Sequence, residues 1–318
     1  MFEDLVKSEL ELVDKVIRKD LGSQVPLINT VGEYIISAGG KRIRPLLTVM
    51  CGRMLGNSSE LIYKMAAMIE YIHTATLLHD DVVDESGLRR GRATANAVFG
   101  NAASVLVGDF IYTRAFQLMV ESNSLKVLKI MADSTNVISE GEVLQLLNIG
   151  RSDLTEAEYF KVIESKTARL FEAGARVAAI VSGATEEVED KLADYAICLG
   201  TAFQIVDDIL DYNSSSEVMG KNVGDDLLEG KVTLPLIFLL TTGDANTKSL
   251  ITAAIDKPKE ADIAKIVNLV VTSDSLDYCR KLAHDYVSRA KSALDALPDN
   301  NYRDALFNIA ELSIERIK

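Results

Sequence analysis

Two short runs of aspartates in this chain have the residue types and the spacing of a metal-binding site. The first is "HDDVVDESG" at residues 79–87 and the second is "FQIVDDILDYN" at residues 203–213. Aspartates three and four positions apart lie on one face of a helix, and their like charges destabilise that helix unless a cation neutralises them. Mg²⁺ suits such a face because it binds hard oxygen ligands together with water and phosphate. The candidate metal-binding residues are Asp80, Asp81 and Asp84 in the first run and Asp207, Asp208 and Asp211 in the second.

The alternative interpretation of each run is an acidic face in contact with solvent. One run alone would leave the two interpretations balanced. The repetition of the pattern, with apolar neighbours such as Val82 and Ile209 in both runs, favours bound metal. A calcium loop of the EF-hand type is excluded, because it needs alternating acidic positions, a central glycine and a final glutamate.

Basic residues accompany both runs and predict a ligand that carries phosphate. Arginine recognises phosphate through two parallel hydrogen bonds, and lysine acts as a mobile point charge. Any one of these residues alone would be an ordinary surface charge, but the set as a whole indicates a diphosphate. The set comprises Lys41, Arg42 and Arg44 in "GGKRIRP", Arg89 and Arg90 after the first run, Lys166 beside Thr167 in "SKTAR", and Lys221 and Lys231 after the second run.

The composition of the chain argues against several classes of protein. The net charge of −13 argues against a nucleic-acid-binding protein and against general binding to anionic membranes. The three cysteines are isolated in the sequence, which fits a reducing compartment and predicts a cytoplasmic protein. The N-terminal segment is charged from its third residue, unlike a signal peptide. There is no run of about 18 apolar residues, so no transmembrane helix is expected and any membrane contact would be peripheral.

The pattern of prolines, glycines and apolar residues predicts an all-α protein. Residues 46–234 contain no proline, so long helices are possible there. Apolar residues recur in this stretch at spacings of three and four, while alternating strand patterns are scarce. Several segments are apolar almost all round, as central helices are. No linker or change of composition divides the chain, so residues 1–318 are expected to form one large helical domain.

These motifs resemble those of the trans-prenyltransferases, also called polyprenyl diphosphate synthases. The matching segments "GGKRIRP", "HDDVVDESGLRRG", "SKTA", "FQIVDDILD" and "GKNVGDDLLEGKVTLP" occur in the family's order between residues 39 and 235. The resemblance implies a single large helical bundle of the isoprenoid synthase type with a central cavity, a homodimer, and three Mg²⁺ ions when substrate is bound. It also implies successive condensation of isopentenyl diphosphate onto an allylic diphosphate. Residues 71–116 look most similar to bacterial members that make the long side chain of a quinone.

The resemblance also implies a role for each matching residue, and the two acidic runs would face each other across the cavity. With Asp208 in support, Mg²⁺ would be held by Asp80, Asp81, Asp84, Asp207 and Asp211. The allylic diphosphate would contact Arg89, Lys166, Lys221 and Lys231, the isopentenyl diphosphate would contact Lys41, Arg44, His73 and Arg90, and Thr167 and Gln204 would line the reacting carbons. By contrast, His79 lies on another helical face than Asp80 and is expected to be structural. The sequence departs from the family pattern at Ala93 and Val232, where many members have proline. Neither position supplies a ligand, so the departures bear on loop geometry alone.

Small residues before the first acidic run predict a long product. Ala75 and Thr76 lie four to five residues before Asp80, or roughly 6–7 Å along a helix. Bulky side chains at these positions would stop the growing prenyl tail, and here the tail could pass into an apolar tunnel. Met119, Met131 and Phe116 are candidates for the floor of that tunnel, and ordinary core packing is an equally good interpretation of them.

Three rival functions remain to be weighed against chain elongation. A terpene cyclase or a head-to-head synthase would share the helices and the first acidic run, but would lack the second run and the Lys41/Arg44 pair. A non-catalytic partner subunit would be expected to lose aspartates, and here they are all present. A lipid carrier could use the same tunnel but would not need two metal sites.

Overall fold

The computed structural model describes residues 2–89, 91–213 and 223–317, so the predicted ligands Arg90 and Lys221 lie outside the described residues. The first half of the chain forms α1 (Phe2–Asp20), α2 (Pro26–Ser37), α3 (Ile43–Met54), α4 (Glu60–Val83), β1 (Leu88–Arg89), β2 (Arg92–Ala93), α5 (Ala95–Phe99), α6 (Asn101–Glu121), α7 (Leu125–Leu147) and α8 (Glu156–Ile163). The second half forms η1 (Glu164–Ala168), α9 (Arg169–Val181), α10 (Glu186–Asn213), α12 (Asp225–Leu228), α13 (Leu234–Thr242), α14 (Ala245–Asp256), η2 (Pro258–Glu260), α15 (Ile263–Thr272), α16 (Ser275–Leu294) and α17 (Asn301–Glu315). Within the described ranges the only sheet is the two-stranded hairpin of β1 and β2, which confirms the all-α prediction.

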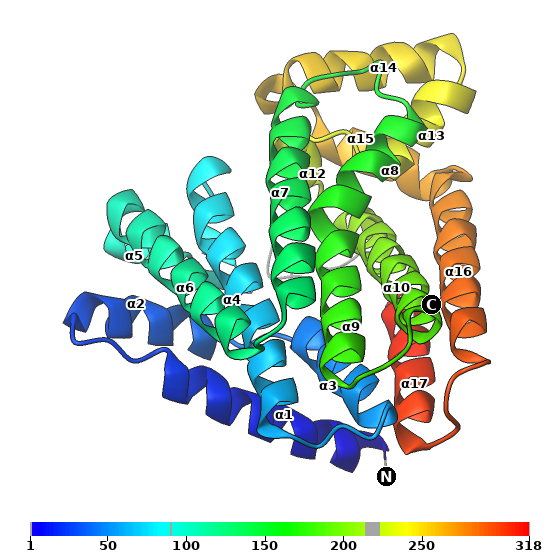
Figure 1. Ribbon diagram of the computed structural model, residues 1–318. Helices are drawn as coiled ribbons and strands as arrows, with labels where there is room; N and C mark the ends of the chain where they lie inside the picture. Colours follow the sequence, from blue (N-terminus) through cyan, green and yellow to red (C-terminus); the bar gives the residue numbers. More distant parts are fainter. Residues whose placement is uncertain (1, 90, 214–222, 318) are drawn as a thin grey trace. The chain divides into compact units, whose positions relative to one another are not determined.

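The described residues group into two compact units. The first unit draws on Met1–Ser134, Leu170–Asp194 and Ala293–Asn308, and the second draws on Thr135–Arg169, Tyr195–Ser292 and Ile309–Lys318. In the first unit α4 packs against α1, α3 and α6, and in the second α13 packs against α8, α14 and α15 (Figure 1). The single domain expected for residues 1–318 stays a prediction.

The proline-free stretch of the sequence forms the longest helices, as its periodicity predicts. Among them α4 has 24 residues and α10 has 28. Every residue of α4 from Met65 to Ile72 is buried. This includes Glu70 and Tyr71 as well as the apolar residues. A helix that is buried on nearly all sides must be apolar on nearly all sides, which explains the near-continuous hydrophobic sequence of this segment.

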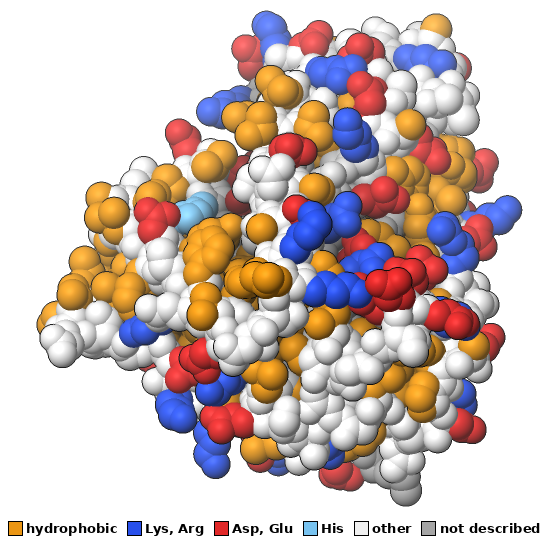
Figure 2. Space-filling model, in the orientation of Figure 1, with side chains coloured by type: hydrophobic (Ala, Val, Ile, Leu, Met, Phe, Trp, Pro, Cys, Tyr) orange, Lys and Arg blue, Asp and Glu red, His pale blue; other side chains and the backbone are white. Residues whose placement is uncertain are grey.

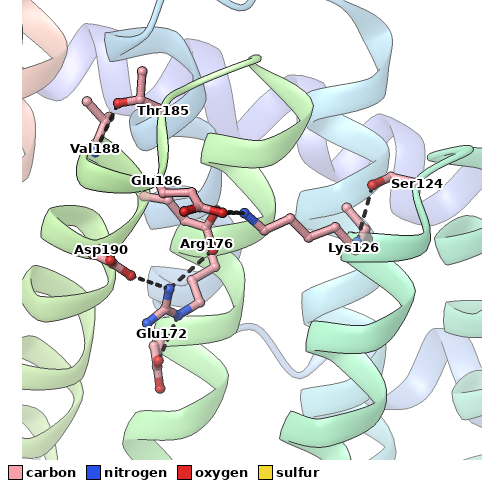
Figure 3. A network of polar contacts seen from close by, with 10 residues as sticks. Ser124, Lys126, Glu172, Arg176, Thr185, Glu186, Val188 and Asp190 are labelled. Carbon is pink, nitrogen blue, oxygen red and sulfur yellow. Dashed lines mark hydrogen bonds and ion pairs between the residues drawn. The ribbon is translucent and has the colours of Figure 1, made fainter.

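A network of ion pairs ties three helices of the first unit together. Arg176 of α9 contacts Glu172 at 2.8 Å, Glu189 at 3.2 Å and Asp190 at 2.9 Å. At the start of α7, Lys126 contacts Glu189 at 2.7 Å and also approaches Glu186 (Figure 3). Because Glu189 is almost fully buried, it depends on these cations to offset the loss of its hydration. We call this group the Arg176 network.

Among the described helices, none is both long enough and apolar enough to cross a membrane.

Candidate active site

The first acidic run lies at the C-terminal end of α4, in the first unit. Asp80 and Asp81 belong to the last turn, and Asp84 is the residue that caps the helix, with its N–H donating to the carbonyl oxygen of Asp80 at 2.8 Å. Backbone carbonyls give this end of a helix a partial negative charge. Three carboxylates there are therefore opposed both by each other and by the helix dipole, which strengthens the expectation of a bound cation.

Arg89 neutralises part of this charge. The guanidinium of Arg89 contacts Asp81 Oδ1 through Nε at 2.9 Å and through Nη2 at 2.7 Å. Asp81 is fully buried, and its second oxygen, Oδ2, has no hydrogen-bond donor in the part of the chain that the structure describes. The short helix α5, which follows the hairpin that carries Arg89, is anchored to the end of α4, since Asn96 Nδ2 donates to the Asp81 carbonyl oxygen at 3.1 Å. The predicted proximity of Arg89 to the first acidic run is thus observed.

Arg44 and His73 meet in the same unit. Arg44 Nη1 lies 3.2 Å from His73 Nε2, and its guanidinium stacks 4.6 Å from the centre of the Phe171 ring. Lys41, three residues before Arg44, has an exposed side chain. These are three of the four residues for which the sequence predicts a contact with isopentenyl diphosphate, and the fourth, Arg90, is not described.

His79 packs between helices, as the sequence interpretation of it expects. Its Nε2 lies 3.3 Å from Asp109 Oδ1 and 3.3 Å from the carbonyl oxygen of Val105, both on α6. The contact requires a glycine at position 108, because a Cβ atom there would lie 2.4 Å from the same nitrogen.

The second acidic run lies on the last turns of α10 and belongs to the second unit. Asp207 pairs with Arg316 Nη1 at 2.8 Å, a contact that joins residues 109 positions apart. Asp211 is 4% exposed, while the side chain of Asp207 is 35% exposed. Asp207 is consequently the aspartate of this run with a side chain that solvent reaches.

Asp208 has a different environment from its neighbours. The Tyr159 hydroxyl donates to Asp208 Oδ2 at 2.6 Å, and Gln204 Nε2 donates to Oδ1 at 2.8 Å. Burial, followed by the negative charge of Asp226, raises the pKa of Asp208 to about 8. Because donors already occupy both oxygens, this carboxyl suits the supporting role that the resemblance implies.

Lys166 and Thr167 lie in η1, a single turn of π-helix between α8 and α9. Turns of this kind are rare and occur frequently at functional sites. Thr167 Oγ1 donates to Gln204 Oε1 at 3.0 Å, so the two neutral side chains predicted to line the reacting carbons are in contact. Lys166 Nζ lies 2.5 Å from Glu142 Oε2 and 2.8 Å from Gln145 Oε1, both on α7.

Lys231 and the candidate tunnel residues complete the predicted set. Lys231 contacts Glu229 at 2.7 Å, and its side chain is 13% exposed. Of the tunnel candidates, Ala75 and Met131 are fully buried, Met119 is 2% exposed and Thr76 is partly buried, whereas Phe116 is 43% exposed. Burial fits a tunnel wall and core packing alike, so a role in setting product length stays a prediction for Met119 and Met131.

Comparison with known proteins decides the family. The family model "Polyprenyl synthetase" matches residues 25–270. The chain is 51% identical to octaprenyl diphosphate synthase of Haemophilus influenzae, over 99% of this chain and 96% of that one, and 50% identical to octaprenyl diphosphate synthase of Escherichia coli, over 98% and 97%. The chain belongs to the polyprenyl synthetase family.

Structural comparison supports the same assignment. A crystal structure of polyprenyl synthase from Caulobacter crescentus, complexed with calcium and isoprenyl diphosphate, has a TM-score of 0.95 and 43% sequence identity, and the alignment covers 100% of this chain and 97% of that one. The polyprenyl synthetase described here therefore has the all-α isoprenoid synthase fold, and it is a prenyltransferase, for which dependence on Mg²⁺ is typical.

The residues of this polyprenyl synthetase fit a metal that is held together with substrate. Among the described residues, no group of three or more His, Cys, Asp or Glu side chains could hold an ion by itself. Mg²⁺ commonly takes one or two carboxylates and fills its remaining positions with water and substrate phosphates. The buried Oδ2 of Asp81, to which no described residue donates a hydrogen bond, has an environment that fits such an ion.

Several contacts of the site could not be found from the sequence. Glu142 and Gln145 contact Lys166, Tyr159 contacts Asp208, and Arg316 contacts Asp207. None of these four residues lies in a segment whose spacing predicts chemistry. For Glu142 and Gln145 the only available signal was the acidic and amide side chains in "EGEVLQLL". An ordinary solvent-exposed helix would carry such side chains equally well.

Proposed function

We propose that this protein is an octaprenyl diphosphate synthase, which condenses isopentenyl diphosphate repeatedly onto farnesyl diphosphate to make the side-chain precursor of a quinone. The observation that carries the proposal is the identity of about half of all residues to two octaprenyl diphosphate synthases over almost the whole chain. The small side chains of Ala75 and Thr76 before the first acidic run support a long product.

The first unit would bind the diphosphate of the allylic substrate through metal. Asp80, Asp81 and Asp84 would hold Mg²⁺, which supplies positive charge to the diphosphate as its bond to the allylic carbon breaks. Arg89, held against Asp81, is placed to contact the same diphosphate, and Arg90 is assigned to isopentenyl diphosphate by resemblance alone. Lys41, Arg44 and His73 would bind the second substrate, isopentenyl diphosphate.

The second unit would support the reacting carbons. Asp207 and Asp211 would hold further Mg²⁺, bringing the number with substrate bound to three, and Lys166, Lys221 and Lys231 would add positive charge. Thr167 and Gln204 present neutral dipoles, which tolerate an allylic cation without trapping it as a strong nucleophile would. Exclusion of water protects that cation from hydrolysis.

The bonds and protons of the reaction balance without a dedicated protein base. The carbon–oxygen bond of the allylic diphosphate breaks and leaves a carbocation and diphosphate. The double bond of isopentenyl diphosphate then forms the new carbon–carbon bond, and the released diphosphate accepts the proton that leaves. The same cycle repeats on the lengthened chain.

A homodimer is the second part of the proposal. The outer side of α6 carries apolar side chains that are largely exposed, including Leu106 at 67% and Val120 at 62%, and hydrophobic atoms gather over α5 and α6 in Figure 2. Soluble proteins seldom leave such a face uncovered, and a second copy of this chain is the occupant that the resemblance implies. Analytical ultracentrifugation of the wild type should therefore give the mass of two chains. The variant Leu106→Glu should sediment with the mass of a single chain.

Product analysis tests the function directly. The purified protein would be incubated with farnesyl diphosphate, isopentenyl diphosphate and Mg²⁺, and its products would be sized by mass spectrometry. A dominant octaprenyl product supports the proposal. A dominant product of another length between hexaprenyl and nonaprenyl would support the same reaction with a different final chain length. Absence of elongation in the presence of Mg²⁺ would contradict the proposal and favour a carrier or a partner subunit. A cytoplasmic location stays a prediction that rests on the cysteines, and no nucleic-acid partner is proposed.

A further inference from the structure

The three cations of "GGKRIRP" have different environments. Lys41 is exposed and Arg44 contacts His73, whereas the side chain of Arg42 is only 11% exposed. Arg42 Nη1 forms an ion pair with Glu70, whose side chain is 8% exposed, and Arg42 Nε lies 3.5 Å from Asp14. A side chain paired in this way with a nearly buried carboxylate is directed at the protein itself.

The backbone of Arg42 is also unusual. It has φ 49° and ψ 32°, the left-handed conformation, and it is the residue that precedes the first turn of α3. Residues other than glycine adopt this conformation at an energetic cost, and they keep it only where the surrounding structure imposes it. The ion pair with Glu70, together with the hydrogen bond from Arg42 Nη2 to the carbonyl oxygen of Ile36 at 3.2 Å, supplies that constraint.

The segment is attached to α4 at two successive points. Glu70 and His73 are three residues apart on α4 and so lie on one face of that helix. Arg42 reaches the first of them and Arg44 reaches the second. An ion pair between two nearly buried side chains is costly to break on one side, because the remaining charge loses its partner without regaining water. Loss of one partner of the Arg42–Glu70 pair is therefore expected to disturb the segment that also carries Lys41 and Arg44.

We propose that Arg42 and Glu70 are positioning residues for the isopentenyl diphosphate site: their ion pair holds the segment in the strained turn that presents Lys41 and Arg44 to the diphosphate. This inference rests on the proposed function for the identity of the ligand. It goes beyond that function because it gives the buried arginine a role different from that of the two cations that flank it.

Three variants test the proposal. Arg42→Gln removes the charge, Glu70→Gln keeps the shape of the acid and removes its charge, and Arg42→Gly keeps the left-handed backbone accessible while removing the side chain. Each is expected to raise the KM for isopentenyl diphosphate roughly 10- to 100-fold, the size of loss that misplacement of binding groups by about 1 Å produces. The KM for the allylic diphosphate should change less than about twofold, since Arg42 contacts Glu70, Asp14 and the carbonyl oxygen of Ile36, which all lie outside the first acidic run.

A matched control separates positioning from stability. Arg53 lies on α3, the helix that Arg42 precedes, and pairs with the nearly buried Glu9 at 3.0 Å. Arg53→Gln should lower the melting temperature by an amount similar to Arg42→Gln and leave both KM values within about twofold of the wild type. The melting temperature of every variant would be measured alongside its kinetics.

The measurements distinguish failure of the positioning role from failure of the proposed function. If the wild type does not elongate farnesyl diphosphate, the function itself is wrong. If the wild type elongates and the two KM values of the Arg42 and Glu70 variants rise together, or if neither rises, the positioning role is wrong. If Arg42→Gly alone retains the wild-type KM for isopentenyl diphosphate, the backbone conformation is sufficient and the ion pair is not a positioning device.

Discussion

Gly141 of α7 allows that helix to touch the π-helical turn that carries Lys166 and Thr167. A Cβ atom built on Gly141 would lie 2.8 Å from Ser165 Cβ and 2.9 Å from the backbone nitrogen of Lys166. Carbon atoms in contact normally lie about 3.5–4.0 Å apart. The change Gly141→Ala must therefore displace η1 or α7 by about 0.7 Å, because the obstructing atoms belong to the backbone or lie next to it and have no rotamer to change.

The displacement should affect activity more than stability. Lys166 is held to α7 by Glu142 and Gln145, one and four residues after Gly141, so a shift between the two elements disturbs the position of its ammonium group. We expect kcat to fall roughly 10- to 100-fold, in line with losses for displacements near 1 Å. Alanine gains about 0.5–1 kcal/mol over glycine within a helix, and overpacking costs about 1–3 kcal/mol. The free energy of unfolding should thus fall by about 0–2.5 kcal/mol.

The assay compares Gly141→Ala with Gly22→Ala, in which the added methyl group meets no atom within 4 Å. Initial rates of elongation from farnesyl diphosphate and the melting temperature would be measured for both variants. Gly22→Ala should match the wild type in both. If Gly141→Ala retains kcat within about twofold while its melting temperature stays within a few degrees, the close contact does not position η1, and the reasoning is wrong.

Three further predictions use other parts of the molecule. Asp80→Ala and Asp207→Ala should each lower the turnover by about 10³-fold or more, as expected for loss of a metal ligand that stabilises a developing charge, and wild-type turnover in either variant would remove that aspartate from the mechanism. Met119→Ala or Met131→Ala should lengthen the product observed by mass spectrometry, and identical products from both would show that these methionines are ordinary core residues. Arg176→Ala, which breaks the Arg176 network, should lower the free energy of unfolding by about 1–3 kcal/mol in a denaturant titration, less than for a fully buried pair because the arginine is partly exposed. Its kcat should stay within about twofold of the wild type, and a large loss of kcat would link this network to the active site.

The long helices, and the positions of most of the aspartates on them, were predictable because both depend on local sequence. The proline-free stretch forms the longest helices. Asp80 and Asp81 share α4 and the three aspartates of the second run share α10, as their spacing predicts. The contact between Thr167 and Gln204 and the contact between Arg44 and His73 match the expected groups of ligands. These pairs were predicted through resemblance, since their separations of 37 and 29 residues follow from no periodicity.

Other features depend on tertiary packing and left no local signal. The position of Asp84 at the cap of α4 depends on where the helix ends, and helix ends are set by interactions that sequence patterns define only within a few residues. The π-helical turn around Lys166 lies against α7 at Gly141, a tertiary contact that no local pattern predicts. The residue types alone did not separate Arg42 from Lys41 and Arg44, and the resemblance gave Arg42 no role. Its ion pair was not predicted, because its buried partner Glu70 lies 28 residues away on another helix.

The two acidic runs share an electrostatic property that their sequences do not express. Each lies in the last turns of a long helix, α4 or α10, where the carbonyl dipoles already favour a positive charge. In each run an arginine from elsewhere in the chain pairs with one aspartate, Arg89 with Asp81 and Arg316 with Asp207. An arginine offsets the charge of one carboxylate only, whereas a divalent cation can offset two. We therefore expect Mg²⁺ to stabilise the acidic helix ends further. The expected result is a higher melting temperature when Mg²⁺ is added with a diphosphate than when diphosphate is added alone.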